Sequence, residues 1–220
     1  MPWSYSALKD FENCARRYHE VRILKRYKER ETEQKLYGDE LHKAAEAYAK
    51  TKQALPEKFA FMQPLIDTLL AKEGKVYPEH QMALTIEYEP CDWWDKRVWV
   101  RGKADLLIID DAQHMAWMVD YKTGKNKDPD KDQLDLLTLL IFEHFPNIVQ
   151  VNSALAFVVN EAFVKHKRFL TEREDLWWRY LERIAKLEKA NEAGVWNPQP
   201  SGLCKKHCAV LSCEYNGRGE

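Results

Sequence analysis

The chain of 220 residues is 45% hydrophobic and 12% aromatic, which is enough for a substantial core and excludes a wholly disordered protein. Its 34 Lys and Arg side chains nearly balance 35 Asp and Glu side chains, so a uniformly basic surface is excluded, while a local basic patch is not. No apolar run approaches the ~20 residues of a membrane span, and the first residues lack the apolar core of a signal peptide. We therefore expect a soluble, cytoplasmic protein without a membrane partner, in which disulfides do not form.

The first 75 residues are expected to be helical. Ser6 is the expected N-cap of a first helix, in a segment that continues as a basic stretch to residue 30. Apolar residues at helical spacing predict a second helix over 34–50 and a third over 57–72.

Strand patterns begin at residue 80. Alternating apolar residues predict strands over 80–89, about 97–109 and 115–122. Asp128 followed by Pro129 then resembles an N-cap with Pro at the first helical position, which predicts a helix ending near residue 144.

The last third of the chain adds a buried strand over 151–159, a long helix over 171–193 and a Cys-rich tail. This order predicts the α/β class, with a mixed central β-sheet flanked by helices. No internal repeat or Gly/Ser-rich linker marks a boundary, so we expect a single domain over 1–220.

Charged residues interrupt two apolar strands. Asp120 and Lys122 are two residues apart and therefore share one face within roughly 7 Å, and Asp105 places a second carboxylate in the preceding strand. Buried carboxylates that converge repel each other, and a divalent cation removes that cost. The alternative is a structural Asp120–Lys122 ion pair, with Asp105 as a turn residue.

Two further polar residues are placed where they could join this site. His42 lies beside the apolar face of the 34–50 helix, and Gly38 one turn earlier leaves room for a ligand. Gln133 falls in the first turn of the helix after the Asp120 strand. The alternatives are a histidine satisfied at a helix–sheet contact and an ordinary surface glutamine.

Three cysteines crowd into the C-terminal tail. Cys204, Cys208 and Cys213, with His207 among them, are close enough in sequence to ligate one metal site, whose fourth ligand would come from elsewhere. The alternative is a set of ordinary reduced cysteines.

Seven residues follow one another in a recognisable order and spacing: Gly38-x3-His42, Gly102-x2-Asp105, Asp120-x-Lys122 and Gln133. This order resembles the PD-(D/E)XK nuclease superfamily, and within it the RecB-like and Cas4-like branch, which includes exonucleases of phage recombination systems. The Ser, Leu, Phe, Cys, Arg and Tyr pattern of residues 6–18 is similar to the opening motif of that branch.

The resemblance spans roughly residues 4–215 and implies a restriction-endonuclease-like core. That nuclease core would cover 76–195, after a helical N-terminal region over 1–75. The Cys-rich tail, 196–220, would pack back on the N-terminus.

The resemblance also implies roles for the site residues. Asp105 and Asp120 would be carboxylate ligands of Mg²⁺ or Mn²⁺, with His42 as a third ligand and the backbone carbonyl of Tyr121 as a fourth. Lys122 would orient or activate the attacking water.

Three further positions bear on how the substrate and the metal would be held. Gln133 would help to place the phosphate, and Glu79 is expected near the metal through a water. A Tyr that often follows the Gln by four positions is Leu137 here.

Many members of this branch hold a [4Fe-4S] cluster between one N-terminal and three C-terminal cysteines, which implies Cys14, Cys204, Cys208 and Cys213. The family spacing C-x2-C-x5-C is replaced here by x3 and x4, and His207 stands where the middle Cys would fall. Three outcomes stay open: an iron–sulfur cluster with a shifted Cys, Zn²⁺ bound by a mixed Cys/His set, or no metal.

The implied function is that of a metal-dependent DNA exonuclease in recombination, repair or replication, acting on ends of single- or double-stranded DNA and phage-encoded in a bacterial host. The alternative is a non-catalytic or structure-specific nucleic-acid-binding module on the same fold. Basic side chains expected to contact phosphates, or else to pair with nearby Glu, are Arg16, Arg17, Arg22, Lys125 and Lys127. Trp93-Trp94 and Trp177-Trp178 are packing residues or candidates to stack on unpaired bases.

Overall fold

The computed structural model describes all residues except 1, 30, 125–128 and 218–220. Contacts between residues divide the chain into two compact units. Unit 1 is built on Thr32–Leu176, and unit 2 combines Trp3–Glu31 with Trp177–Glu220. The expected single nuclease domain over 1–220, with its three regions, stays a prediction.

Unit 1 contains a six-stranded sheet with the order β2-β1-β3-β4-β5-β6. Its strands are β1 (Lys75–Leu84), β2 (Pro90–Cys91), β3 (Val100–Asp110), β4 (Met115–Lys122), β5 (Gln150–Phe157) and β6 (Ala162–Phe169). Strands β4 and β5 are parallel, and the other neighbouring pairs are antiparallel. The predicted α/β class with a mixed sheet flanked by helices is confirmed.

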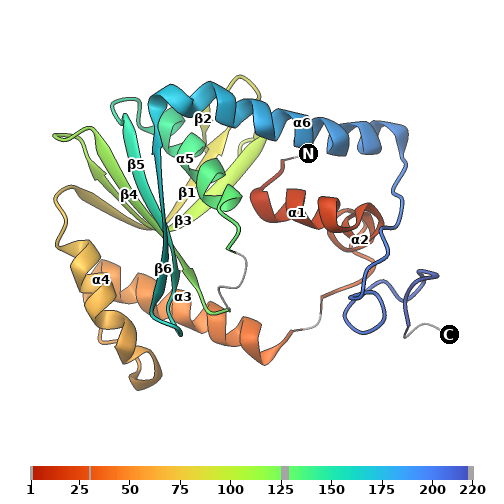
Figure 1. The fold of residues 1–220 in the computed structure, drawn as a ribbon, viewed down its shortest axis with the longest axis horizontal. Helices are drawn as coiled ribbons and strands as arrows, with labels where there is room; N and C mark the ends of the chain where they lie inside the picture. Colours follow the sequence, from red (N-terminus) through yellow and green to blue (C-terminus); the bar gives the residue numbers. More distant parts are fainter. Residues whose placement is uncertain (1, 30, 125–128, 218–220) are drawn as a thin grey trace. The chain divides into compact units, whose positions relative to one another are not determined.

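Helices cover both faces of this sheet (Figure 1). On one face, α5 (Asp132–His144) lies against β3, where Leu137 and Leu140 contact Gly102. On the other face, α3 (Glu33–Thr51), the 3-10 helix η2 (Glu57–Met62) and α4 (Gln63–Leu70) bury one apolar cluster with β3, β4 and β5. The carboxyl-terminal part of β4 therefore lies where α3 and α5 approach it from opposite faces.

Local chemistry explains where the α3 helix begins and ends. The Thr32 hydroxyl accepts a hydrogen bond from the backbone N–H of Lys35 and thereby caps the first turn. Lys52 adopts a left-handed conformation, with φ of 58°, and ends the helix. The predicted helix over 57–72 instead begins as the 3-10 segment, and α4 starts with Pro64 in its first turn.

Two predicted helix starts differ from the structure. Ser4, not Ser6, caps α1, because its hydroxyl accepts the N–H of Ala7. The helix expected to open at Asp128 begins at Asp132, where Lys131 is the N-cap residue and provides no side-chain cap.

The strands also differ in detail from the sequence prediction. The strand expected over 80–89 is shifted to β1, because Thr85–Glu89 forms a turn in which Tyr88 has a φ of 63°. Strand β6 was not predicted. Its exposed positions include Lys165 and Lys167, which weaken the apolar signal of an edge strand.

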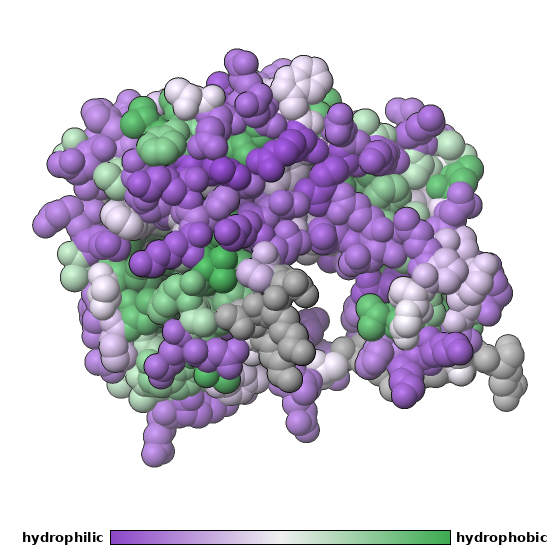
Figure 2. Space-filling view, viewed as in Figure 1, coloured by the Kyte–Doolittle hydropathy of each residue, from purple (hydrophilic) through white to green (hydrophobic). Residues whose placement is uncertain are grey.

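An apolar groove lies beside α4 in unit 1. Its volume is about 540 Å³, and its lining includes Leu65, Trp117, Phe163 and Lys167. Figure 2 shows green hydrophobic residues gathered on the left of a face that is otherwise mainly hydrophilic. On the face of the sheet that α3 and α4 cover, the part next to β6 is thus less completely covered than the part beneath α3.

Unit 2 joins the N-terminal helices to the C-terminal part of the chain. It contains α1 (Tyr5–Asn13), α2 (Ala15–Tyr18), the π-helix η1 (His19–Ile23) and most of α6 (Arg173–Ala193), which follows the 3-10 helix η3 (Leu170–Glu172). Arg183 of α6 donates two hydrogen bonds to Glu12 at 2.6 and 2.9 Å. Across the described residues, no helix has the length and apolarity needed to cross a membrane.

Candidate metal site and cysteine pocket

The two carboxylates of the candidate site come from neighbouring strands. Asp105 on β3 and Asp120 on β4 have exposed fractions of only 8% and 4%. The backbone N–H of Tyr121 donates a 2.7 Å hydrogen bond to Asp105 Oδ2, which fixes that carboxylate across the strand pair. Two acidic groups are thus held at one end of the sheet with little water around them.

His42 reaches these carboxylates from α3. Its Nδ1 lies 3.3 Å from Asp105 Oδ1 and 3.6 Å from Glu79 Oε1. One potential ligand atom from each of the three residues lies within 4.8 Å of the others. This group could hold a metal ion, and it gives Glu79 a more direct place than the water-mediated one expected from the sequence.

Glu79 is held in an unusual backbone conformation. Its φ of 51°, within β1, lies in the left-handed region that a glutamate rarely adopts. The side chain also forms an ion pair with Lys103 of β3. Backbone strain of this kind persists where surrounding contacts enforce it and is concentrated at functional sites.

The carboxylates change the protonation of this group. Burial opposes a charged imidazole, but hydrogen bonds to Asp105 and Glu79 outweigh it and raise the pKa of His42 to about 10. Burial would raise the pKa of Glu79, yet His42 and Lys103 lower it below its ordinary value. His42 is therefore a cation at neutral pH in this arrangement.

Gln133 links the other two predicted residues. Its Nε2 donates to Asp120 Oδ1 at 2.7 Å, and its Oε1 accepts from Lys122 Nζ at 2.8 Å. Lys122 Nζ also lies 2.6 Å from Asp120 Oδ2, although that buried oxygen has no partner of hydrogen-bonding geometry among the described residues. Burial and the charge of Asp105 raise the pKa of Asp120, against the lowering effect of Lys122.

All of these groups face one cavity of about 560 Å³. Its lining residues are Asp39, His42, Lys43, Glu46, Glu79, Lys103, Asp105, Asp120, Tyr121, Lys122 and Gln133. Gly38 is not among them; a Cβ at that position would lie 3.5 Å from Thr123 Oγ1, in ordinary contact. Gly38 therefore lies where α3 meets the end of β4, next to Thr123, and does not open the ligand space expected from the sequence.

Two lysines that line the cavity were not predicted from the sequence, Lys43 and Lys103. Lys103 stands inside the Gly102-x2-Asp105 motif, and alternation along the strand could have placed it on the face opposite α5. Tyr121 is buried, and burial raises its pKa far above the ordinary value. Metal ligation by the Tyr121 carbonyl stays a prediction.

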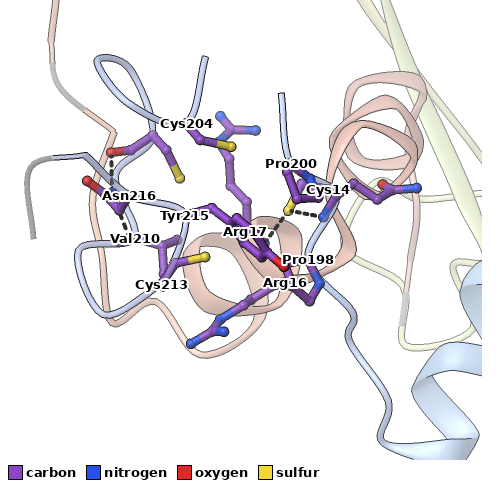
Figure 3. A pocket seen from close by; sticks show the side chains of 12 residues that line it. Cys14, Arg16, Arg17, Pro198, Pro200, Cys204, Val210, Cys213, Tyr215 and Asn216 are labelled. Carbon is purple, nitrogen blue, oxygen red and sulfur yellow. Dashed lines mark hydrogen bonds between the residues drawn. The ribbon is translucent and has the colours of Figure 1, made fainter. Parts of the chain in front are cut away.

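The predicted cysteine set gathers in unit 2. Cys14, Cys204, Cys208 and Cys213 line one pocket, together with Arg16 and Arg17. Figure 3 shows Cys14, from the N-terminal helices, and Cys204 and Cys213, from the tail, around this pocket. His207 is exposed and is not part of the lining.

The cysteine sulfurs already accept backbone hydrogen bonds. Cys14 Sγ accepts from Gln199 N at 3.4 Å and from Arg17 N at 3.5 Å, and Cys204 Sγ accepts from Ser201 N at 3.3 Å. Across the part of the chain that is described, however, no three cysteine sulfurs lie within 4.8 Å of one another.

The arginines predicted to bind nucleic acid are engaged in ion pairs. Arg16 contacts Glu214 at 2.7 Å, and Arg17 and Arg22 both pair with Asp10. Phosphate binding by these side chains would compete with those carboxylates. The other two predicted phosphate contacts, Lys125 and Lys127, lie outside the described residues.

Comparisons with known proteins agree with this architecture. The family model described as the PD-(D/E)XK nuclease superfamily matches residues 2–215. Among solved structures, the chain is similar to a predicted exonuclease from Eubacterium rectale, with a TM-score of 0.52 and 14% identity, covering 91% of this chain and 85% of that chain. It is also similar to the protein SSO0001, with a TM-score of 0.48 and 15% identity, covering 97% and 85% respectively. No curated protein matches the chain in sequence.

Proposed function

Because the chain belongs to the PD-(D/E)XK nuclease superfamily, we propose that it is a divalent-metal-dependent deoxyribonuclease that removes nucleotides from DNA ends. One observation carries this proposal. His42, Asp105, Asp120, Lys122 and Gln133, which are far apart in sequence, line a single cavity. A purely structural ion pair between Asp120 and Lys122 would not require the other three side chains.

The donor set fits a hard divalent cation such as Mg²⁺ or Mn²⁺. Asp105 and Asp120 supply carboxylate oxygens, His42 supplies an imidazole that Mn²⁺ tolerates well, and Glu79 adds a third carboxylate. Asp120 Oδ2 is buried and lies 2.6 Å from Lys122 Nζ without hydrogen-bonding geometry among the described residues, so a metal ion could take the place of that ammonium group. A bound ion would lower the pKa of a water ligand and offset negative charge on the scissile phosphate.

The chain's own residues would position the reacting groups. Lys122 places a positive charge in the cavity, and Gln133 holds its ammonium group by accepting a 2.8 Å hydrogen bond. A fixed cation near the phosphate would stabilise the negative charge that develops during hydrolysis. Lys43 and Lys103 also line the cavity, and their ammonium groups would contact an anionic substrate once a bound metal ion offset the carboxylates there.

Digestion of end-labelled DNA tests this function. Wild-type protein should release label from linear single- or double-stranded DNA with Mn²⁺ or Mg²⁺, leave closed circles intact and be inactive in EDTA. Lys122→Ala should lower the rate by about 10²–10³-fold, because an oriented charge is lost. Exposed Lys165 lies outside the cavity, so Lys165→Ala is the matched control.

Folding and DNA binding distinguish the alternatives. Lys122→Ala should still fold and keep the wild-type DNA affinity, although its unfolding midpoint should fall because buried Asp120 loses its cation. Wild-type activity in this variant would show that the proposed site is wrong. DNA binding without cleavage by metal-loaded wild-type protein would identify a non-catalytic binding module.

We infer that the four pocket cysteines hold a [4Fe-4S] cluster rather than one Zn²⁺ ion. Cys14, Cys204, Cys208 and Cys213 line one pocket, whereas His207 is exposed outside it, so an all-cysteine site is favoured over a mixed Cys/His zinc site. The backbone hydrogen bonds to Cys14 and Cys204 are of the type that tunes cluster sulfurs.

Metal and acid-labile sulfide analysis of protein purified without oxygen tests the cluster. Iron and sulfide in equal amounts are expected, and stoichiometric zinc without iron would refute it. A cluster joining Cys14 to the tail would support membership of the RecB-like and Cas4-like branch. On that basis we infer a role in phage-type DNA recombination, repair or replication.

A further inference from the structure

A line of side chains leads along β3 from the cavity to an exposed aromatic group. Gly102 faces Leu137 and Leu140 of α5, so Arg101 and Lys103 on either side of it point to the opposite face. Lys103 lines the cavity itself. Because a strand advances about 3.3 Å per residue, Arg101, four residues before Asp105, lies about 13 Å from it along β3.

At the far end of this line, the guanidinium of Arg101 contacts the rings of two tryptophans. Its guanidinium carbon lies 5.1 Å from the centroid of the Trp93 ring and 5.6 Å from that of Trp94. The two indoles meet edge to face, with centroids 6.5 Å apart. Trp94 nevertheless remains 82% exposed, which is unusual for the largest apolar side chain.

The turn that carries Trp94 is held in place by its own polar residues. Asp95 Oδ1 accepts the backbone N–H of Arg97 at 2.8 Å, and the two side chains form an ion pair at 2.8 Å. Arg97 therefore offsets the negative charge of Asp95 next to Trp94. The exposed indole is presented by an ordered turn, beside the guanidinium of Arg101, for which no ion pair is found among the described residues.

We propose that Trp94 and Arg101 form a subsite for an unpaired nucleotide of the substrate strand. The indole face would stack on a base, and Arg101 would bind the adjacent phosphate, with Lys103 the next cation toward the cavity. An extended single strand advances per nucleotide by about the same distance as two residues of β3, so the subsite would lie roughly two nucleotides from the scissile bond. This inference rests on the proposed nuclease function and adds a preference for single-stranded ends.

A duplex cannot use this platform in the same way. Base pairs are already stacked on both faces, so an indole gains a base contact only where the strand is unpaired. The subsite should therefore contribute to the binding of single strands and tailed duplexes, and little to the binding of blunt duplexes.

Fluorescence anisotropy with labelled oligonucleotides in EDTA tests the subsite without relying on cleavage. Trp94→Ala should weaken binding of a single-stranded oligodeoxynucleotide by about tenfold, the effect typical of one lost base–aromatic stack, and change blunt-duplex affinity by less than about twofold. Trp94→Phe should retain most of the affinity but lose most of the quenching of protein fluorescence by the oligonucleotide. Trp178, 67% exposed on α6, provides the matched control Trp178→Ala, for which no change is expected.

Arg101→Ala should weaken the same binding and lower its salt dependence, because one phosphate contact is lost. In cleavage of single-stranded DNA, Trp94→Ala should raise KM more than it lowers kcat. An oligoribonucleotide of the same sequence should show an equal loss, because stacking does not depend on the sugar.

Two results separate this inference from the proposed function. If wild-type protein cleaves DNA but Trp94→Ala binds single strands within about twofold of wild type, the subsite is refuted and the nuclease stands. If metal-loaded protein cleaves nothing but Trp94→Ala still loses single-strand binding selectively, the nuclease function fails and the nucleotide contact stands.

Discussion

Asp135 of α5 provides a test of how the sheet holds Gln133 in place. The residue is only 2% exposed. Its carboxylate accepts hydrogen bonds from His166 Nε2 at 2.6 Å and from Arg168 Nε at 2.8 Å. Both partners belong to the edge strand β6. Asp135→Asn keeps the shape of the side chain and removes its charge, two residues after Gln133.

The expected loss of stability is about 3 kcal/mol. Removing one partner of a buried ion pair leaves an uncompensated charge and typically costs about 3–5 kcal/mol. Arg168 is 23% exposed and keeps a second partner, Glu172, at 3.1 Å, so the lower end of that range applies. Such a loss would be a large fraction of the roughly 5–15 kcal/mol that stabilises a folded domain.

The same contacts give stability a dependence on pH. Burial would raise the pKa of Asp135, but His166 and Arg168 outweigh it and lower the pKa to about 2. A carboxyl group with a depressed folded pKa stabilises the protein above its ordinary value near pH 4, and that contribution is lost as pH falls toward 2. The difference corresponds to about 2 kcal/mol.

Urea unfolding of wild type and Asp135→Asn at several pH values between about 2 and 7 measures both effects. The variant should unfold at lower urea concentration at pH 7, and its stability should change less between pH 4 and pH 2. A loss below 1 kcal/mol at pH 7, or the same acid dependence in both proteins, would refute the role of this ion pair.

Two other changes have calculable outcomes. Gly102→Ala would place a Cβ 2.7 Å from Leu140 Cδ1 and 2.8 Å from Leu137 Cδ2. The free energy of unfolding, measured with heat or urea, should fall by about 1 kcal/mol, because the flexible ends of these leucines can move. A loss above about 3 kcal/mol would mean that they cannot move. Mn²⁺ affinity, measured by calorimetry, should rise with pH through the neutral range, because the ion must displace the proton of His42, whose pKa is raised to about 10. His42→Asn should remove most of that pH dependence, and an unchanged dependence would exclude His42 as a ligand.

Local patterns in the sequence were sufficient to predict the elements that carry the site. The apolar strands around Asp105 and Asp120 stand out because charged residues interrupt them, and the helix with His42 has a clear apolar face. These patterns depend on residues two to four positions apart, which is the range over which periodicity is informative.

Contacts between distant segments could not be predicted in the same way. Glu79 lies just before the strand predicted at 80–89, but the register of β1 on β3, in which His80 pairs with Ala104, places it opposite Asp105. Register depends on the packing of whole strands, and a single sequence does not reveal it. Strand β6 was missed for a related reason, because its exposed charged residues give a weak strand pattern and its pairing with β5 is set by the folded sheet.

The candidate site is nearly balanced in charge before any metal binds. Protonated His42, Lys103 and Lys122 face the three carboxylates of Glu79, Asp105 and Asp120, and each cation lies within ion-pair distance of at least one of them. These pairs allow three acidic groups to converge without a cation from solution. A divalent ion that bound here would have to displace a proton and loosen existing ion pairs, so we expect the folded chain to assemble the site first and the pH of the solution to set how readily metal enters it.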